Sequence, residues 1–252
     1  MRDPRTYGVS RRLRDVGRIM SIVSGKGGVG KSTISSILAL VLRDHGYSVG
    51  LLDLDFHGPS CHEILGIESF SYEEERGIKP YMYNGIAFAS IYPFVREEYV
   101  TLRGVDVSNA LIEFMAIINW GRLDFLIMDM PPGMGDPLLD IARLVERAEY
   151  IVVSSSSRLS ISTVARLVRF LRKFNYNIVG IIENMVRGEK RNAVSLAEEY
   201  GVRYLCSIPY DENLEEAIGD IGKLRKTLVW DVLAGEALPV ITRHAYNQET
   251  TL

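Results

Sequence analysis

The sequence predicts an α/β fold, with a mostly parallel, doubly wound sheet and helices on both of its faces. Short apolar runs alternate with amphipathic segments of helix length along the chain. The apolar runs are continuous rather than alternating, which is typical of parallel strands buried on both faces. Several of them end in Asp, Asn or a glycine-rich loop, at the sheet edge where such folds bind ligands. We find no internal repeat and no sign of a second domain.

The expected elements follow from these periods. The expected strands are 19–23, 48–53, 86–91, 125–129, 150–154, 178–183 and 204–208, and the expected helices are 32–45, 107–118, 160–174 and 193–200, followed by terminal helices. Segment 66–85 interrupts this alternation, and its charged run 73–76 precedes Gly77. We therefore expect an exposed excursion there.

Length and composition indicate one domain over residues 19–252, because a chain of 252 residues with 47% hydrophobic content can bury a sizeable core. The first 18 residues hold six arginines against two aspartates, and we expect a flexible basic N-terminal arm. The net charge of −3 gives no overall basic field, so nucleic acid is not expected as the main partner. No run approaches 18 apolar residues, so we expect no transmembrane segment. We expect the protein to be cytoplasmic.

A glycine-rich loop between the first expected strand and helix carries the clearest chemistry. Residues 24–33 read SGKGGVGKST, which matches the phosphate-binding pattern G-x-x-x-x-G-K-[ST]. The expected nucleotide-binding residues are Gly25, Gly27, Gly28, Val29, Gly30, Lys31, Ser32 and Thr33. The glycines let backbone N–H groups surround the phosphates, Lys31 can reach the β- and γ-phosphates, and Ser32 can hold Mg²⁺.

A second lysine, Lys26, follows the first glycine of this loop. The loop resembles the deviant Walker A motif of the MinD, ParA, nitrogenase iron protein and Mrp ATPases. That resemblance implies a homodimer through the nucleotide site, with Lys26 crossing to the nucleotide of the partner. An ammonium supplied in this way would neutralise charge as the γ-phosphate leaves, so Lys26 and Lys31 are both candidate catalytic residues.

Carboxylates at two other strand ends complete a predicted Mg²⁺ site. Asp129 ends the apolar strand 125–129 and can hold the ion through a water molecule, beside Ser32. Asp55 follows Asp53 by two residues, so both point to the same side where their strand ends. We assign Asp55 to the metal and to the attacking water, while either aspartate could instead bind N–H groups of the next turn. Gly133, in the loop MPPGMGD after Asp129, is expected to approach the γ-phosphate and move when it leaves.

Three residues at the ends of the next strands could contact the base. Asn184 offers a donor and an acceptor that suit adenine, and Pro209 and Asp211 close the following strand. Each could alternatively be an ordinary turn residue. Together with the absence of an Asn-Lys-x-Asp run, they favour ATP over GTP.

The whole pattern resembles the Mrp family of P-loop ATPases over roughly residues 19–219. The motifs that carry the resemblance are residues 25–33, 53–60, Arg103-Gly104, 120–125, 129–136 and Glu183-Asn184-Met185. The resemblance implies ATP hydrolysis and a role in iron–sulfur cluster assembly or carriage. The family usually places a C-x-x-C pair shortly after Glu-Asn-Met, so that two subunits hold a 4Fe–4S cluster.

This sequence departs from the family at that point, because residues 186–192 contain no cysteine. The two cysteines of the chain, Cys61 and Cys206, are far apart. We expect Cys206 to be a small buried side chain and Cys61 to be a structural or incidental thiol. The sequence therefore supports ATPase chemistry better than cluster carriage.

Two alternatives stay open. The first is a switch of MinD or ParA character, whose ATP-bound dimer recruits a protein partner and whose hydrolysis releases it. A membrane-binding terminal helix would favour MinD, but segment 238–247 contains a proline and is too mixed in character. The second is a P-loop kinase or an amide-forming enzyme such as dethiobiotin synthetase, which would need a pocket for an acceptor substrate.

Overall fold

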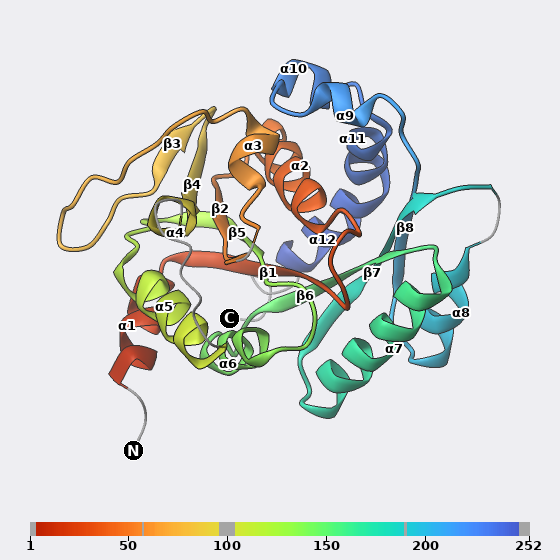
Figure 1. Cartoon of the computed structure of the whole chain (residues 1–252), viewed down its shortest axis with the longest axis horizontal. Coiled ribbons are helices and arrows are strands. Elements are labelled where there is room, and N and C mark those ends of the chain that lie inside the picture. Colours follow the sequence, from red (N-terminus) through yellow and green to blue (C-terminus); the bar gives the residue numbers. More distant parts are fainter. Residues whose placement is uncertain (1–3, 57, 96–103, 189–190, 247–252) are drawn as a thin grey trace.

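The computed structural model describes residues 4–56, 58–95, 104–188 and 191–246. Within these residues the strands form one eight-stranded sheet in the order β3-β4-β2-β5-β1-β6-β7-β8 (Figure 1). The strands are β1 (Val16–Ser24), β2 (Val49–Asp53), β3 (Tyr81–Tyr83), β4 (Ile86–Ser90), β5 (Leu123–Asp129), β6 (Glu149–Ser155), β7 (Asn177–Val186) and β8 (Tyr204–Pro209). All neighbouring pairs are parallel except β3 and β4.

Helices cover both faces, which confirms the predicted doubly wound sheet (Figure 1). One face carries α1 (Pro4–Arg12), α5 (Gly104–Ile117), α6 (Asp136–Leu144), α7 (Arg158–Lys173) and α8 (Asn192–Glu199). The other carries α2 (Lys31–Asp44), α3 (Cys61–Leu65), α9 (Leu214–Ala217), α10 (Ile221–Leu224), α11 (Leu228–Val232), the π-helical turn η1 (Leu233–Ala237) and α12 (Leu238–Tyr246). A single turn, α4 (Tyr92–Val95), follows β4.

The central strands fix the position of the glycine-rich loop. β1 lies between β5 and β6, and its apolar side chains enter both cores, with Ile19 and Val23 on one face and Met20 and Ile22 on the other. Helix α2 then packs a fully buried stripe that includes Ile34 against the second face. Each such side chain contributes roughly 1.5–3 kcal/mol on burial. The loop between β1 and α2 is therefore anchored at both ends by the core.

The expectation of a flexible N-terminal arm is wrong for the residues that the structure describes. Residues 4–12 form α1, which packs on α5 with Val9 fully buried and Leu13 nearly so. Arg12 Nε donates a 3.0 Å hydrogen bond to the carbonyl of Ala116. In the sequence, the many arginines of this segment obscure its apolar side. The expected domain boundary after residue 18 is also wrong, because it lies inside β1, which begins at Val16.

The excursion 66–85 is more ordered than we expected. Its charged tip is exposed, but the segment adds the antiparallel edge strand β3 through a turn at Asn84 and Gly85, both with positive φ. Tyr72 fastens it to β4, because its hydroxyl donates to the Ser90 carbonyl and accepts from the Ser90 N–H, at 2.6 and 2.7 Å. A three-residue strand is too short to give a periodic signal in sequence.

The last residues that the structure describes form a continuous helical segment through α11, η1 and α12. The π-turn lies directly before Pro239, where the missing N–H interrupts the regular helical pattern. None of the helices in the described part of the chain is long and apolar enough to cross a membrane.

Candidate functional site

The carboxyl ends of β1, β2 and β5 meet at one edge of the sheet. Asp129 at the end of β5 lies in register with Asp53 of β2 on one side and Ile22 of β1 on the other. A cavity of about 260 Å³ opens there. Its lining consists of Ser24, Lys26, Gly27, Gly28, Val29, Gly30, Lys31, Ser32, Thr33, Asp55, Gly58, Ser60 and Pro132. The structure thus brings most of the predicted phosphate loop and Asp55 together.

Two glycines of the loop are required by close approach of other elements. A Cβ on Gly25 would lie 2.7 Å from the backbone carbon of Thr163 in α7. Gly30 has φ +82°, and a Cβ there would lie 2.3 Å from Nδ2 of Asn184. Gly28 also has positive φ but faces open space. The loop is therefore clamped between α7 and the end of β7.

Lys31 is buried in this cavity between two carboxylates. Its Nζ lies 2.8 Å from Oδ2 of Asp129 and 3.7 Å from Oδ2 of Asp55. Burial disfavours the ammonium, but Asp129 and then Asp55 outweigh this effect and raise the pKa of Lys31. Lys31 is therefore charged and held at the place where a phosphate could replace its carboxylate partners.

Asp129 also organises the start of α2. Its Oδ2 accepts a hydrogen bond from Ser32 Oγ and its Oδ1 accepts one from Ser35 Oγ, both at 2.7 Å. Sequence reasoning missed Ser35, which is fully buried. Its position one helical turn after Ser32 is the signal that the sequence offered. The oxygens of Ser32, Asp55 and Asp129 form a hard donor set that suits Mg²⁺.

Asp53 has the loop-binding role that we left open for either aspartate. It is fully buried, and its two oxygens accept the N–H groups of Asp55 and Cys61, each at 3.1 Å. Burial first, and then Asp129, raise the pKa of Asp53 to about 7. Asp55 instead lies at the cavity, where it is 8% exposed.

Both cysteines are buried and unpaired, which confirms the prediction for Cys206 and adds the burial of Cys61. Burial raises the pKa of the Cys61 thiol well above its usual value and that of Cys206 to about 12. Donor atoms of Asp53, Cys61 and Asp129 lie within 4.8 Å of one another. We assign no further metal to this group, because both oxygens of Asp53 already accept backbone N–H groups and the buried Cys61 thiol has a raised pKa.

Lys26 and Gly133 lie at the rim of the same edge. Lys26 is half-buried, and its carbonyl accepts a hydrogen bond from Ser24 Oγ at 3.0 Å. Gly133 has φ +86°, and its N–H donates to the carbonyl of Ser24 at 2.9 Å. The loop after β5 is thus tied to the start of the phosphate loop, although Gly133 does not line the cavity.

The three candidate base residues fall into two groups. Asn184 is buried, and its Nδ2 donates to the carbonyl of Val29 at 2.9 Å, which leaves its Oδ1 as an acceptor. Pro209 ends β8 and is exposed. The Asp211 carboxylate accepts the N–H groups of Asn213 and Leu228 at 3.0 and 2.7 Å. Asn184 bonds to the phosphate loop at Val29, but none of these three residues lines the phosphate cavity.

Met185, which sequence reasoning treated only as part of a motif, has φ +57°, an uncommon conformation for this residue type. Its side chain lies against Gly30, where its Cε would be 3.4 Å from an added Cβ. His57 and Arg103 lie outside the described residues.

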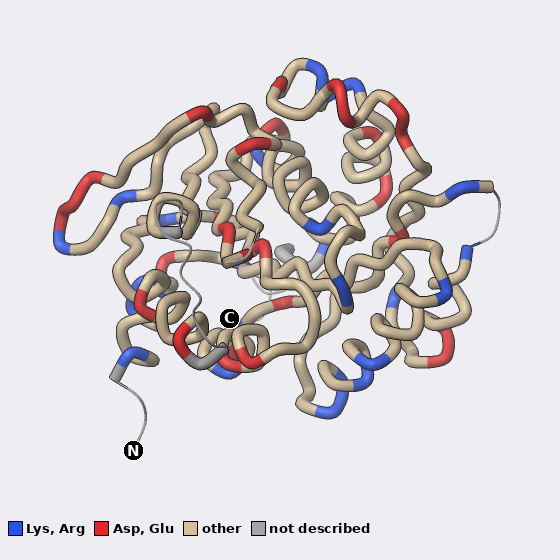
Figure 2. Tube along the Cα trace, viewed as in Figure 1, with Lys and Arg blue, Asp and Glu red and all other residues tan. Residues whose placement is uncertain are grey.

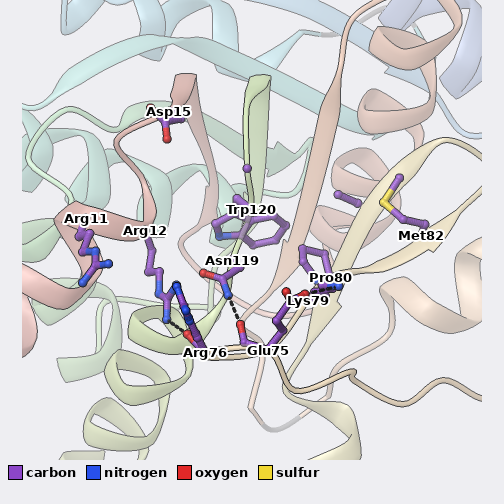
Figure 3. Close-up of a pocket in the computed structure, with 12 residues that line it drawn as sticks. Arg11, Arg12, Asp15, Glu75, Arg76, Lys79, Pro80, Met82, Asn119 and Trp120 are labelled. Atoms are coloured by element: carbon purple, nitrogen blue, oxygen red, sulfur yellow. Dashed lines mark hydrogen bonds and ion pairs between the residues drawn. The ribbon is translucent and has the colours of Figure 1, made fainter.

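A second cavity, of about 1050 Å³, lies at the opposite end of the sheet between α1 and the 73–80 hairpin (Figure 3). Its cations are partly engaged within the protein, since Arg12 donates to the carbonyl of Arg76 at 2.6 Å and Lys79 pairs with Glu75. Asn119 donates to the Glu75 carbonyl at 2.9 Å across its floor. These contacts hold the hairpin on the sheet, and we assign the cavity no ligand.

The glycine-rich loop between β1 and α2, with a carboxylate at the end of the adjacent β5, defines a P-loop NTPase. The chain belongs to the ParA family of NUBPL iron-transfer P-loop NTPases, whose model matches residues 15–228.

Named relatives agree with this family. The chain is 37% identical over 227 residues to an iron-sulfur cluster carrier protein of Saccharolobus solfataricus, covering 83% of this chain and 76% of that protein. It is 32% identical over 257 residues to the cytosolic Fe-S cluster assembly factor CFD1 of Kluyveromyces lactis, covering 93% and 90%. It spans only 61–65% of the length of several bacterial carriers that it also matches.

Solved structures show the same fold. A nucleotide-binding protein from Archaeoglobus fulgidus, in complex with ADP, aligns with a TM-score of 0.74 at 29% identity, over 88% of this chain and 93% of that one. The MinD cell division protein of Aquifex aeolicus aligns with a TM-score of 0.65 at 20% identity, over 89% and 97%.

Proposed function

We propose that this protein is a Mg²⁺-dependent ATPase that acts as a dimer in iron–sulfur cluster assembly. The observation that carries the ATPase proposal is Lys31, which is charged and buried 2.8 Å from Asp129 inside the cavity of the glycine-rich loop. On binding ATP, Lys31 exchanges its carboxylate partners for the β- and γ-phosphate oxygens, while loop N–H groups bind the remaining oxygens. Asp55 then orients the attacking water.

Ser32, Asp55 and Asp129 would hold Mg²⁺. Bound there, the ion would neutralise negative charge that builds on the phosphate oxygens. Ser32 and Asp129 are already joined at 2.7 Å, so the donor set is ordered before the ion arrives. Gly133 follows the state of the γ-phosphate, and its bond to Ser24 supplies the link to the loop.

Selectivity for ATP over GTP rests on Asn184. Its Nδ2 is engaged by Val29, and its Oδ1 can accept a hydrogen bond from the amino group of adenine, which guanine replaces with a carbonyl oxygen. We propose that Pro209 and Asp211 flank the base, with Asp211 fixing the loop shape through its two backbone contacts.

Dimerisation would bring Lys26 to the nucleotide of the partner. Two exposed apolar side chains support this, namely Met134, 38% exposed, and Leu159, 64% exposed. They lie in segments tied to the loop, because Gly133 donates to Ser24 and Thr163 touches Gly25. Exposed apolar groups beside a catalytic loop fit a dimer that closes over its substrate.

The role in cluster assembly comes from the relatives named above, and a cytosolic location goes with it. The cysteines of this chain do not fit a cluster of their own, because both are buried and their thiols have raised pKa values. We therefore propose that the thiolate ligands come from a protein client.

Anaerobic reconstitution with iron and sulfide tests this role, with the Saccharolobus solfataricus carrier treated in parallel. We expect no cluster absorption on this protein alone, and ATP-dependent transfer when a thiol-bearing client is added. About four irons per dimer on this chain alone would contradict the assignment of the ligands to a client. Absence of ATP hydrolysis in all mixtures would contradict the ATPase itself.

An ATP-dependent switch of MinD or ParA character is the second candidate. The burial of both cysteines favours it, since such a switch needs no thiol ligands. It predicts ATP-dependent dimerisation and partner binding without any effect on iron transfer.

A further inference from the structure

A groove of about 450 Å³ runs between α7 and α8, away from the nucleotide cavity. Ile161, Ala165 and Leu196 give it apolar lining. Arg158 and Arg191 lie among the residues around it, and Glu199 is the one carboxylate that the described residues contribute to the lining. An apolar floor with two cations beside it differs from an ordinary solvated helix surface.

The charge of α7 is one-sided. The helix contains no Asp or Glu and exposes Arg158, Arg166, Arg169, Arg172 and Lys173, although the whole chain carries −3 (Figure 2). Toward the end of the helix, Arg169 donates to the Tyr200 hydroxyl at 2.9 Å and Arg172 reaches the Gly201 carbonyl. Arg158, at the start of α7, is exposed, and no hydrogen bond or ion pair of its side chain is found within the described residues. Arg191 donates to the Gly188 carbonyl at 2.9 Å through one nitrogen, which leaves its other N–H groups for an anion.

We propose that the α7–α8 groove binds an acidic segment of a partner protein. An apolar side chain of that segment would cover Ile161, Ala165 and Leu196, and its carboxylates would pair with Arg158 and Arg191. The apolar floor favours a protein over a nucleic acid, whose phosphates would use the cations and leave the floor uncovered. The partner is thus defined as an acidic segment with at least one large apolar residue.

Both walls of the groove are connected to the glycine-rich loop. In α7, Thr163 touches Gly25. At the start of α8, the N–H groups of Asn192 and Ala193 donate to Glu183 at 3.0 and 3.3 Å. Glu183 precedes Asn184, whose amide binds Val29. Occupation of the groove is therefore coupled to the nucleotide, and this coupling, unlike the groove itself, rests on the proposed function.

The test is a selection of displayed 12-residue peptides on the full-length protein, followed by anisotropy titration of a labelled enriched peptide. The altered proteins are the Arg158→Ala/Arg191→Ala double variant and Ser162→Glu, which adds a negative charge at an exposed lining position. Arg172→Ala is the matched control, because it removes a cation from the same helix outside the groove. Thermal unfolding and ATP affinity are measured for every variant.

We expect enrichment of peptides with Asp or Glu around Leu, Phe or Met. The double variant and Ser162→Glu should each raise Kd at least about tenfold, the cost of one lost charge-assisted hydrogen bond, with Arg172→Ala within about twofold. Selection without acidic bias, or equal binding to the double variant, overturns the proposal. Displacement of the peptide by a single-stranded oligonucleotide of equal charge also overturns the proposal. Loss of ATP-dependent dimerisation in the double variant overturns it too, because the groove would then bind a second copy of this chain.

Nucleotide dependence separates this inference from the proposed function. ATP in place of ADP should change the peptide Kd by at least about threefold if the two sites are coupled. Peptide binding without any ATP binding would retain the groove and overturn the ATPase. ATP binding and hydrolysis without acidic peptide binding would retain the ATPase and overturn the groove.

Discussion

The side-chain amide of Asn184 donates a 2.9 Å hydrogen bond to the backbone carbonyl of Val29, so the end of β7 holds the glycine-rich loop directly. The contact joins residues 155 positions apart. It leaves no space at Gly30, whose missing side chain is what allows Asn184 to approach. The loop is therefore fixed by a neighbouring strand as well as by its own backbone geometry.

Gly30→Ala should destabilise the protein by about 1–3 kcal/mol, because a Cβ at φ +82° is strained and would lie 2.3 Å from the Asn184 amide. Gly27→Ala is the control, since nothing lies within 4 Å of its added Cβ, and it should change the free energy of unfolding by less than about 0.5 kcal/mol. Denaturant unfolding measures both. Equal effects would show that the contact with Asn184 does not constrain the loop.

Lys31→Ala should weaken ATP binding by about 100-fold or more, because it removes the buried ammonium that meets the phosphates. Lys26→Ala should retain affinity within about threefold and lower turnover about 10²–10³-fold, since we propose that Lys26 acts on the nucleotide of the partner. Calorimetry and phosphate release separate the two effects. Equal losses of affinity and turnover in Lys26→Ala would count against its action across the dimer.

Asp129→Asn should reduce the benefit of Mg²⁺ for ATP binding, because it removes the carboxylate that accepts from Ser32 and that we propose as a ligand of the ion. The affinity measured in excess EDTA should change little. Asp140→Asn is the control, because the Asp140 side chain on α6 is 36% exposed, and this variant should behave as the wild type. An unchanged ratio of affinities with and without Mg²⁺ in Asp129→Asn would remove Asp129 from the metal site.

Cys61 and Cys206 should not react with a thiol reagent in the native protein near neutral pH. Both are buried, and their raised pKa values keep them as thiols, whereas the thiolate is the reactive form. Unfolding in denaturant should expose both thiols, and a chromogenic disulfide reagent measures their number. Rapid native reaction of either cysteine would reopen the question of cluster ligation by this chain.

Val9→Ala should cost about 1–3 kcal/mol of stability, because Val9 of α1 is fully buried in the core. Tyr7→Ala in the same helix is the control, since Tyr7 is 71% exposed, and should cost less than about 0.5 kcal/mol. If the first residues formed a flexible arm, thermal unfolding would show no difference between the two variants.

Long apolar runs and the glycine-rich loop were readable in the sequence because their signals are local. The strands at 125–129 and 150–154 fall within the observed β5 and β6, and Asp55 lines the cavity of the phosphate loop. The roles of Asp53 and Asp211 were not readable, because an aspartate that binds backbone N–H groups has the same letter as one that faces a ligand. Helix α1 was missed because its arginines masked the apolar pair Val9 and Leu13.

The sequence by itself determined the parallel α/β class, the phosphate loop with its extra lysine and the lack of a C-x-x-C pair, since each depends on residue order over short spans. Only the tertiary structure decided which aspartate faces the cavity, that Cys61 is buried, and that α7 and the end of β7 clamp the loop. These properties depend on contacts between distant segments, such as Gly25 with Thr163 and Asn184 with Val29, and packing sets them.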